Sequence, residues 1–370
     1  MVDIEIAPGK RAKTAYSFDD ISIVPSRRTR EPNDVSTAWQ IDAYKFSMPL
    51  MAAPMDSVVS PETAIALGKL GGLGVLNLEG LWTRFENPKI QLGEISSIPA
   101  EQATARMQEL YKAPIRPELI KERLAEIRAA GVTVAGALSP QRTAEFYKTV
   151  LAAGVDLFVI RGTTVSAEHV STAQEPLNLK KFIYELDVPV IVGGCATAQS
   201  ALHLMRSGAA GVLVGFGGGA AHTTRQVLGI SVPMATAVAD VASARREYLD
   251  ESGGRYVHVI ADGSVGKSGD IAKAIACGAD AVMLGSPLAR AEEAPGRGWH
   301  WGSEVHHHEF PHDVRVYVNT SGTLQEILLG PSHSADGTMN LFGALRRAMA
   351  TCGYSDVKEF QRVEVVLNRA

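Results

Sequence analysis

A short pattern that recurs along the chain limits the folds open to it. A helical stretch ends at a small residue followed by glycine, and a short apolar run begins at once. The pattern occurs in RAAGVTVAGAL, AAGVDLFVI, SGAAGVLVGFG and CGADAVMLGS, around Gly131, Gly154, Gly208 and Gly278. Glycine after a helix takes the left-handed conformation that turns the chain back. The apolar runs are continuous rather than alternating, which is typical of strands covered on both faces.

Eight such strands are expected, which favours a TIM-type (β/α)8 barrel over an open doubly wound sheet. The runs are Pro49–Ala53, Gly72–Asn77, Val132–Leu138, Val155–Arg161, Pro189–Gly193, Gly211–Gly215, Val257–Ala261 and Ala281–Gly285. Helices are expected between them, for example at Ser60–Leu70, Pro117–Ala130 and Ser268–Cys277. An open sheet is the alternative if one run is miscounted.

The segment Ala289–Ser334 breaks this pattern, because it is rich in Gly, Pro and His and has no clear period. A long irregular segment after the last strand is typical of a lid, and there it would cover the catalytic face of a barrel. We therefore predict a mobile flap at about 289–334. The whole chain, 1–370, is expected to form one barrel domain with an N-terminal extension over 1–45.

Composition excludes several classes of protein. With 36 Lys and Arg against 40 Asp and Glu, the net charge of −4 argues against nucleic-acid or membrane-surface binding. No apolar run approaches the ~20 residues of a membrane span, and MVDIEIAPGKR lacks the apolar core of a secretory signal. Cys195, Cys277 and Cys352 show no paired or zinc-type spacing, which fits a reducing compartment. A cytoplasmic globular protein is expected.

The strongest chemical signal follows the last two expected strands. Asp262-Gly263-Ser264 comes directly after one strand, and Gly285-Ser286 after the next. Glycine lets backbone N–H groups approach an anion, serine adds a hydroxyl donor, and such barrels often bind phosphate there. A carboxylate at a strand end suits the two hydroxyls of a ribose. The residues predict a nucleotide site, with ordinary tight turns as the alternative.

A second glycine-rich segment spans Gly215–Gly229 and contains three consecutive glycines. Each glycine loses backbone entropy on ordering, so packing alone does not account for the run. Such a loop turns its carbonyl groups toward a monovalent cation or its amides toward a ligand. A flexible connector is the alternative, since a glycine-rich loop alone is a weak signal.

At these segments the chain resembles the IMP dehydrogenase/GMP reductase family. The similar stretches are YSFDDISIVPSRR (Tyr16–Arg28), MPLMAAPMDSVV (Met48–Val59), GGLGVLN, VGFGGGAAHTTRQVLGISVPMATAVADVA and HVIADGSVGKSGDIAKAIACGADAVMLGSPLA. Only about 50 residues, Leu78–Ala129, stand where IMP dehydrogenases usually carry a pair of regulatory CBS modules, too few for two such modules. The chain is therefore similar to short relatives of IMP dehydrogenase without CBS domains.

The resemblance implies a site for a purine nucleoside monophosphate (IMP, GMP or XMP) and an NAD- or NADP-linked oxidoreductase of purine nucleotide metabolism. It assigns the ribose to Asp262, the phosphate to the loops of the last two strands, and the base and ribose to the first strand. The residues implied are Ala53, Met55, Asp262, Gly263, Ser264, Gly285 and Ser286. The carbonyls of Gly217, Gly219 and His222 would stand where IMP dehydrogenases bind K⁺, and a homotetramer or octamer is implied as well.

The catalytic face departs from the family. His222 stands where the family has the cysteine that attacks purine C2, with Ala220 or Ala221 for the preceding serine and Thr224 further along the catalytic loop. A thiolate is both nucleophile and leaving group, so imidazole makes the family's covalent route doubtful. The nicotinamide side differs too, because the expected Asp, Asn and Glu are replaced and the flap lacks the Arg-Tyr pair that activates water. The replacements are Arg161, Gly194 and Thr320.

The sequence offers two candidates to replace the missing thiol. Cys195 follows a strand at the same end of the barrel, although a free cysteine is more often a small buried residue. A metal is a second possibility, because the flap has a cluster of potential ligands; exposed loop histidines, however, are usually solvated. These ligands are His306, His307, His308, Glu309 and His312.

A third use of the flap is closure over a bound base, which histidine would make sensitive to pH. The side chains expected to close are Trp299, Trp301, His306 and His308. Two functions follow from these observations. One is an oxidoreductase in which His222 or another group replaces the thiol. The other is a catalytically deficient sensor or regulatory protein that binds a purine nucleotide without turnover.

Overall fold

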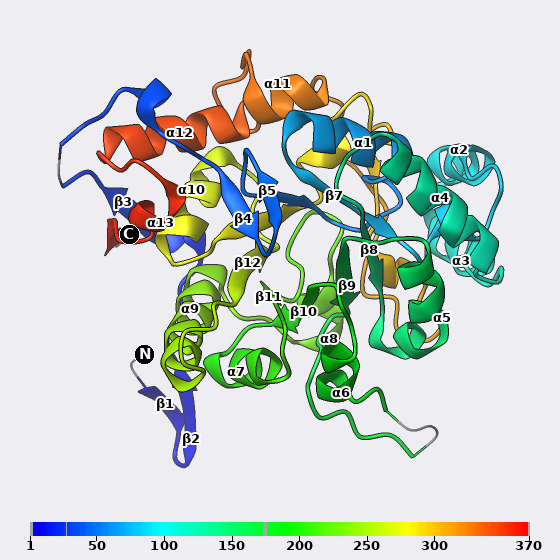
Figure 1. Cartoon of the computed structure of the whole chain (residues 1–370), viewed down its shortest axis with the longest axis horizontal. Coiled ribbons are helices and arrows are strands. Elements are labelled where there is room, and N and C mark those ends of the chain that lie inside the picture. Colours follow the sequence, from blue (N-terminus) through cyan, green and yellow to red (C-terminus); the bar gives the residue numbers. More distant parts are fainter. Residues whose placement is uncertain (1–2, 27, 173–175, 369–370) are drawn as a thin grey trace.

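The computed structural model describes residues 3–26, 28–172 and 176–368, and its centre is a closed barrel of eight parallel strands (Figure 1). The barrel strands are β6 (Leu50–Ala52), β7 (Leu73–Asn77), β8 (Ala135–Leu138), β9 (Leu157–Arg161), β10 (Val190–Cys195), β11 (Gly211–Val214), β12 (His258–Asp262) and β13 (Ala281–Leu284). They follow one another around the ring, and β13 pairs with β6 to close it. The predicted barrel is confirmed: every strand overlaps its predicted run, although β10 and β12 continue two residues and one residue beyond it.

Helices cover the outside of this ring (Figure 1). The three predicted ones are α1 (Pro61–Leu70), α4 (Pro117–Ala129) and α10 (Ser268–Ala276). The others are α2 (Lys89–Ser97), α3 (Ala100–Leu110), α5 (Pro140–Ala152), α6 (Leu179–Tyr184), α7 (Ala198–Arg206), α8 (Thr224–Leu228), α9 (Met234–Glu251), α11 (Leu324–Leu329), α12 (Leu341–Thr351) and α13 (Val357–Phe360). Helix α1 begins as predicted: the Ser60 side chain accepts the N–H of Thr63, and Pro61 is the first helical residue.

The barrel strands are buried along most of their length, which explains their continuous apolar sequence. Every residue of β8, β11 and β13 is buried. One face of each strand packs into the barrel interior and the other against the surrounding helices, so neither face admits a solvated polar residue.

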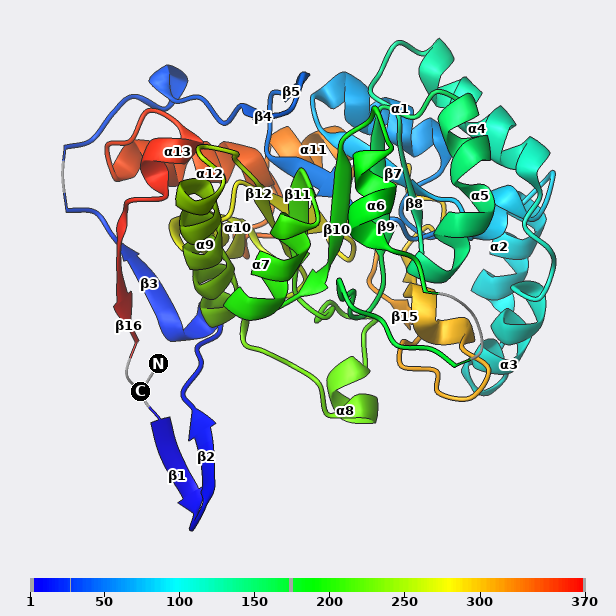
Figure 2. The same ribbon diagram turned by 60° about the horizontal axis from the view of Figure 1, so that its bottom comes forward.

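The chain before the barrel forms small antiparallel pairs. β1 (Asp3–Ala7) and β2 (Lys10–Lys13) form a hairpin that projects from the body in Figure 2. β3 (Ile21–Val24) pairs with β16 (Glu364–Leu367), and β4 (Trp39–Ile41) with β5 (Tyr44–Phe46). The N-terminal extension is thus tied to the C-terminal strand.

The flap segment contains regular structure that sequence analysis did not predict. β14 (Trp299–His300) and β15 (Val316–Tyr317) pair, and α11 contacts α1 and α12. Trp301 is buried, and its indole N–H donates to the Tyr111 hydroxyl over 3.1 Å. That hydroxyl in turn donates to buried Asp56 over 2.5 Å, and burial raises the pKa of Asp56 to about 6. The segment is therefore anchored by a buried polar chain, and its exposed tip is residues 308–310.

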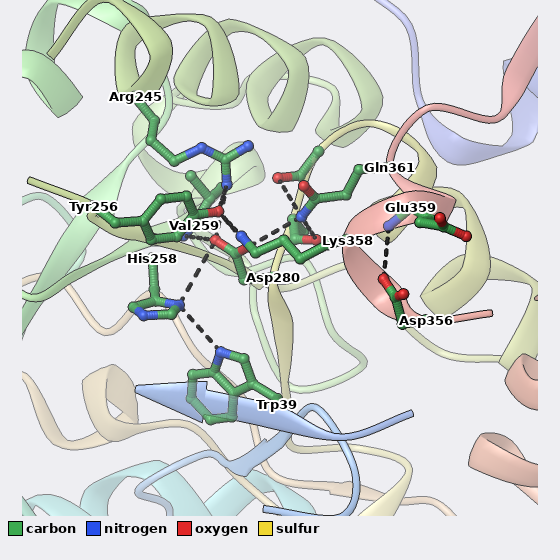
Figure 3. Close-up of polar contacts among 12 residues, drawn as sticks. Trp39, Arg245, Tyr256, His258, Val259, Asp280, Asp356, Lys358, Glu359 and Gln361 are labelled. Atoms are coloured by element: carbon green, nitrogen blue, oxygen red, sulfur yellow. Dashed lines mark hydrogen bonds and ion pairs between the residues drawn. The ribbon is translucent and has the colours of Figure 1, made fainter. Parts of the chain in front are cut away.

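The N-terminal ends of the strands carry a buried polar network centred on Asp280 (Figure 3). One carboxylate oxygen accepts from Arg245 and the backbone of Val259, each over 2.8 Å. The other accepts from Tyr256, Lys358 and Gln361 over 2.7, 2.6 and 3.0 Å. Lys358 lies on α13 and Gln361 directly follows it, so the network ties the end of the chain to the barrel face opposite the loops that follow the strands.

Candidate active site

A cavity of about 480 Å³ opens at the C-terminal ends of the barrel strands. It brings together residues that the sequence separates by more than 200 positions, because parallel strands in a barrel end on one face. All of the predicted nucleotide-binding residues line it, namely Ala53, Met55, Asp262, Gly263, Ser264, Gly285 and Ser286. His222 and Gly219 of the glycine-rich loop line it as well.

The glycine-rich loop lies directly against the predicted phosphate loops. A Cβ atom on Gly218 would lie 2.4 Å from the Ser264 hydroxyl, and one on Gly219 would lie 2.9 Å from the Ser286 hydroxyl. The Ala220 N–H donates to the same Ser286 hydroxyl over 3.1 Å. These close contacts, together with the positive φ angles of Gly217 (84°) and Gly218 (128°), favour glycine here. The Gly219 carbonyl accepts the N–H of His222, so one of the predicted K⁺ ligands already has a partner within the loop.

Asp262, the predicted ribose ligand, is paired with Arg161. The Arg161 Nε–H donates to the carboxylate over 3.3 Å, and both side chains are largely buried. Arg161 is one of the departures from the family pattern, and its partner was not foreseen. The pair neutralises the carboxylate while leaving it on the cavity wall, where its free lone pairs can still accept from a diol.

Two further cations and a histidine reach the cavity without having been predicted. Lys267 and Arg290 line it and would neutralise a phosphate. Lys267 was readable from the same GSVGKSG loop, whereas Arg290 follows the last strand without a motif. His300 is buried on the wall with its Nδ1 3.1 Å from the Ser57 hydroxyl, and burial lowers its pKa to about 3, so its ring is neutral.

His222 is joined to the flap. Its Nδ1 lies 2.7 Å from a carboxylate oxygen of Asp313, whose side chain is almost completely buried. The backbones on either side also pair, because the Val314 N–H donates to Ala221 and the Thr223 N–H donates to His312. The catalytic-loop position and the flap therefore meet as a short antiparallel bridge. No sequence motif marks Asp313. Its contact with His222 is seen only in the folded structure, where the flap packs against the glycine-rich loop.

A small pocket of about 20 Å³ adjoins this pair. It lies between the end of β9 and the docked flap, and its walls include Arg161, His222, Thr224, Glu304 and Asp313. Thr224, the second predicted catalytic-loop residue, is thus beside His222. A single water requires roughly 10–15 Å³ on this measure, so the pocket has room for one water.

Several predicted groups lie away from the 480 Å³ cavity. Trp301 is buried against Tyr111, and His306 stacks on the same ring with centroids 4.2 Å apart. Trp299 lines a separate cavity beside α2, and His308 is exposed. Trp301 and His306 therefore anchor the flap, while Arg290 and His300 are the flap residues that line the 480 Å³ cavity. Trp301 and His306 pack against Tyr111 at the end of α3, and no sequence pattern indicates this contact.

The alternative chemistries find little support in the geometry. Cys195 is completely buried, and burial raises the pKa of its thiol to about 12, which disfavours the reactive thiolate. Within the described ranges, no three His, Cys, Asp or Glu side chains are grouped so as to hold a metal ion. Gly194 leaves no space for the amide found in the family, because a Cβ there would lie 2.2 Å from the Gly215 carbonyl.

The fold and the cavity define a (β/α)8 barrel whose polar cavity lies at the C-terminal ends of the strands, where such barrels frequently bind phosphate. Similarity to known proteins identifies the family within this class. The family model described as the IMP dehydrogenase / GMP reductase domain matches residues 15–309, and the chain belongs to this family.

Two of the similar proteins match nearly the whole chain, and a third matches about three quarters of it. An uncharacterized oxidoreductase of Mycobacterium leprae is 55% identical over 99% of this chain and 100% of its own. An inosine-5′-monophosphate dehydrogenase of Methanocaldococcus jannaschii is 29% identical over 77% of this chain and 74% of its own. A crystal structure of an IMP dehydrogenase/GMP reductase-like protein from Corynebacterium glutamicum has a TM-score of 0.95 and 51% identity, covering 99% of this chain and 98% of that one.

The described part of the chain contains no helix long and apolar enough to cross a membrane.

Proposed function

We propose that the protein binds a purine nucleoside 5′-monophosphate in the 480 Å³ cavity. The observation that carries the proposal is the convergence on this one cavity of Asp262, Ser264 and Ser286 with Met55. Asp262 suits the ribose hydroxyls, and the serine hydroxyls with the neighbouring Lys267 suit a phosphate. Met55 provides an apolar surface for the base.

Calorimetry with IMP, GMP and XMP tests the proposal. Asp262→Ala removes a charged acceptor, and hydrogen bonds to charged groups are worth ~1.5–3 kcal/mol, so the affinity should fall roughly tenfold to over a hundredfold. Asp250→Ala, at an exposed position on α9, is the matched control and should bind as wild type does. Equal affinity of wild type and Asp262→Ala for the nucleotides would refute the assignment of Asp262 to the ribose.

An NAD(P)-linked oxidoreductase acting on that nucleotide is the reaction that family membership supports. The pocket of about 20 Å³ between the end of β9 and the docked flap has no room for a nicotinamide ring. Arg161 and Gly194, at the ends of β9 and β10, also replace the Asp and Asn that the family has on the nicotinamide side. A dinucleotide whose nicotinamide enters this pocket therefore does not fit while the flap is docked.

A nucleotide-binding sensor without turnover is the second candidate. It is favoured by the replacement of the attacking thiol by His222 together with the burial of Cys195, while all seven predicted nucleotide-binding residues line one cavity. Absorbance at 340 nm separates the two, with IMP plus NAD in one assay and GMP plus NADPH in the other. Turnover in either supports the enzyme, and nucleotide binding without turnover supports the sensor.

Assembly into a homotetramer or octamer, a cytoplasmic location and K⁺ binding at Gly217, Gly219 and His222 are proposed on family grounds. The segment around α8 stands away from the barrel in Figure 2 and exposes Val227, Leu228 and Ile230. Exposed apolar side chains of this kind suit contact with a second copy. Analytical ultracentrifugation with and without K⁺ tests the assembly.

A further inference from the structure

The contact between His222 and Asp313 defines which nitrogen of the imidazole carries the proton. An ionised carboxylate only accepts hydrogen bonds, so in the neutral ring Nδ1 donates to Asp313 and Nε2 keeps its lone pair. The second carboxylate oxygen accepts the backbone N–H of Glu304 over 2.9 Å. Asp313 is therefore held from two sides, and it orients the ring. Nε2 has no hydrogen-bond partner among the contacts of the described residues.

His222 lies between two spaces, a small pocket and the large cavity. His222 lines both the 20 Å³ pocket, which has room for one water, and the 480 Å³ cavity. A base must lie within hydrogen-bond reach of the proton that it removes, directly or through one water. Base, orienting carboxylate, water pocket and nucleotide cavity are thus contiguous.

We propose that His222 acts as a general base, with Asp313 as its positioning residue, and activates water for addition to C2 of the bound purine. The inference rests on the proposed nucleotide binding. Nε2 of His222 takes a proton from water as the oxygen bonds to C2, and a π electron pair of the ring or of its carbonyl moves off C2. No thiol, metal or dinucleotide is needed for this addition. The dyad exists only while the flap is docked, because Asp313 belongs to the flap.

Oxygen exchange into XMP isolates this step. Water labelled with ¹⁸O adds to the C2 carbonyl, the former carbonyl oxygen takes the proton from His222, and two equivalent hydroxyls result. Removal of the proton from the labelled hydroxyl by His222 then breaks the other C–O bond. That oxygen leaves as water once His222 returns the proton. The nucleotide regains its carbonyl with ¹⁸O at C2, and no redox partner takes part.

Mass spectrometry of XMP incubated with the protein in ¹⁸O-labelled water measures the exchange. IMP has oxygen at C6 but none at C2, so it reports exchange at C6 alone. We expect label in XMP and none in IMP. His222→Ala should slow the exchange roughly 10²–10⁴-fold, the usual contribution of a general base. His169→Ala, at an exposed histidine, is the control and should exchange as wild type does.

Asp313→Asn tests the positioning role separately. The amide is nearly isosteric, but its NH₂ group would donate to Nδ1 and place the ring proton on Nε2, the wrong tautomer for a base. Exchange should fall while XMP affinity, measured by calorimetry, and the melting temperature stay near wild type. If Asp313→Asn unfolds, His222→Ala still decides the role of the base.

The outcomes separate this inference from the proposed function. XMP that binds without exchanging overturns the general base and leaves nucleotide binding intact. Exchange that persists in His222→Ala overturns it too. Failure of XMP, IMP and GMP to bind refutes the proposed function and the inference together.

Discussion

Asp280→Asn should destabilise the protein strongly while leaving the nucleotide cavity unchanged. The carboxylate is buried at the N-terminal face of the barrel and accepts hydrogen bonds from five groups (Figure 3). The Arg245 side chain is only 7% exposed, so removing the charge leaves a buried guanidinium unpaired. Breaking a buried pair by removing one partner costs ~3–5 kcal/mol. We expect the free energy of unfolding to fall by about that amount.

Two control variants show whether the loss of unfolding free energy comes from the buried centre of the network. Lys358 also contacts Asp280, but its side chain is 54% exposed, so solvent screens the pair and Lys358→Met should cost below ~1 kcal/mol. Glu247→Gln changes an exposed carboxylate on α9, the helix that carries Arg245, and should stay within ~0.5 kcal/mol of wild type.

Urea denaturation followed by tryptophan fluorescence measures these differences, provided that refolding on dilution is first shown to be complete. Calorimetry with a purine nucleotide well below the transition should give wild-type affinity for Asp280→Asn, since the network lies on the opposite face from the cavity. The reasoning is refuted if Asp280→Asn unfolds at the same urea concentration as Glu247→Gln, or if Lys358→Met costs as much as Asp280→Asn.

Three further predictions concern the flap and the site. A protease of broad specificity such as subtilisin should cut native protein first at the flap tip, residues 308–310, where Phe310 is 58% exposed, and a bound nucleotide should slow the cut; first cleavage in the barrel would contradict a mobile flap. His222→Cys should react with a purine analogue electrophilic at C2, seen as an adduct by intact mass, while NAD reduction stays weak; vigorous IMP turnover by wild type would overturn this view of the site. Burial lowers the pKa of His300 from 6.5 to about 3, so the unfolded chain binds more protons between these values and the protein loses stability as pH falls through that window. His300→Gln should flatten this part of the curve of unfolding free energy against pH, and an unchanged slope would show that another group carries the acid sensitivity.

Much of the architecture was readable from sequence, because it depends on local chemistry. Glycine after each helix and the continuous apolar runs located the strands, since a strand covered on both faces tolerates no polar position. The loops around Asp262 and Ser286 were identified for another general reason. All parallel strands of a barrel end on one face, whatever the detailed packing, so the loops that follow them lie together. Helix α11 was missed, as it is only six residues long and lies in a segment rich in loop-forming residues.

The tertiary structure alone decided which side chains meet. Arg161 and Asp262 are 101 positions apart, and His222 and Asp313 are 91 apart, so no local pattern relates either pair. The flap aromatics looked suited to a base, yet Trp301 is buried against Tyr111, directly after α3, where an apolar ring gains more from burial than at an open cavity. Sequence alone therefore determined the barrel and the position of the loops that line its cavity, through periodicity and backbone chemistry. The partners of its charged groups and the position of the flap depend on contacts between distant segments, which exist only once the chain has folded.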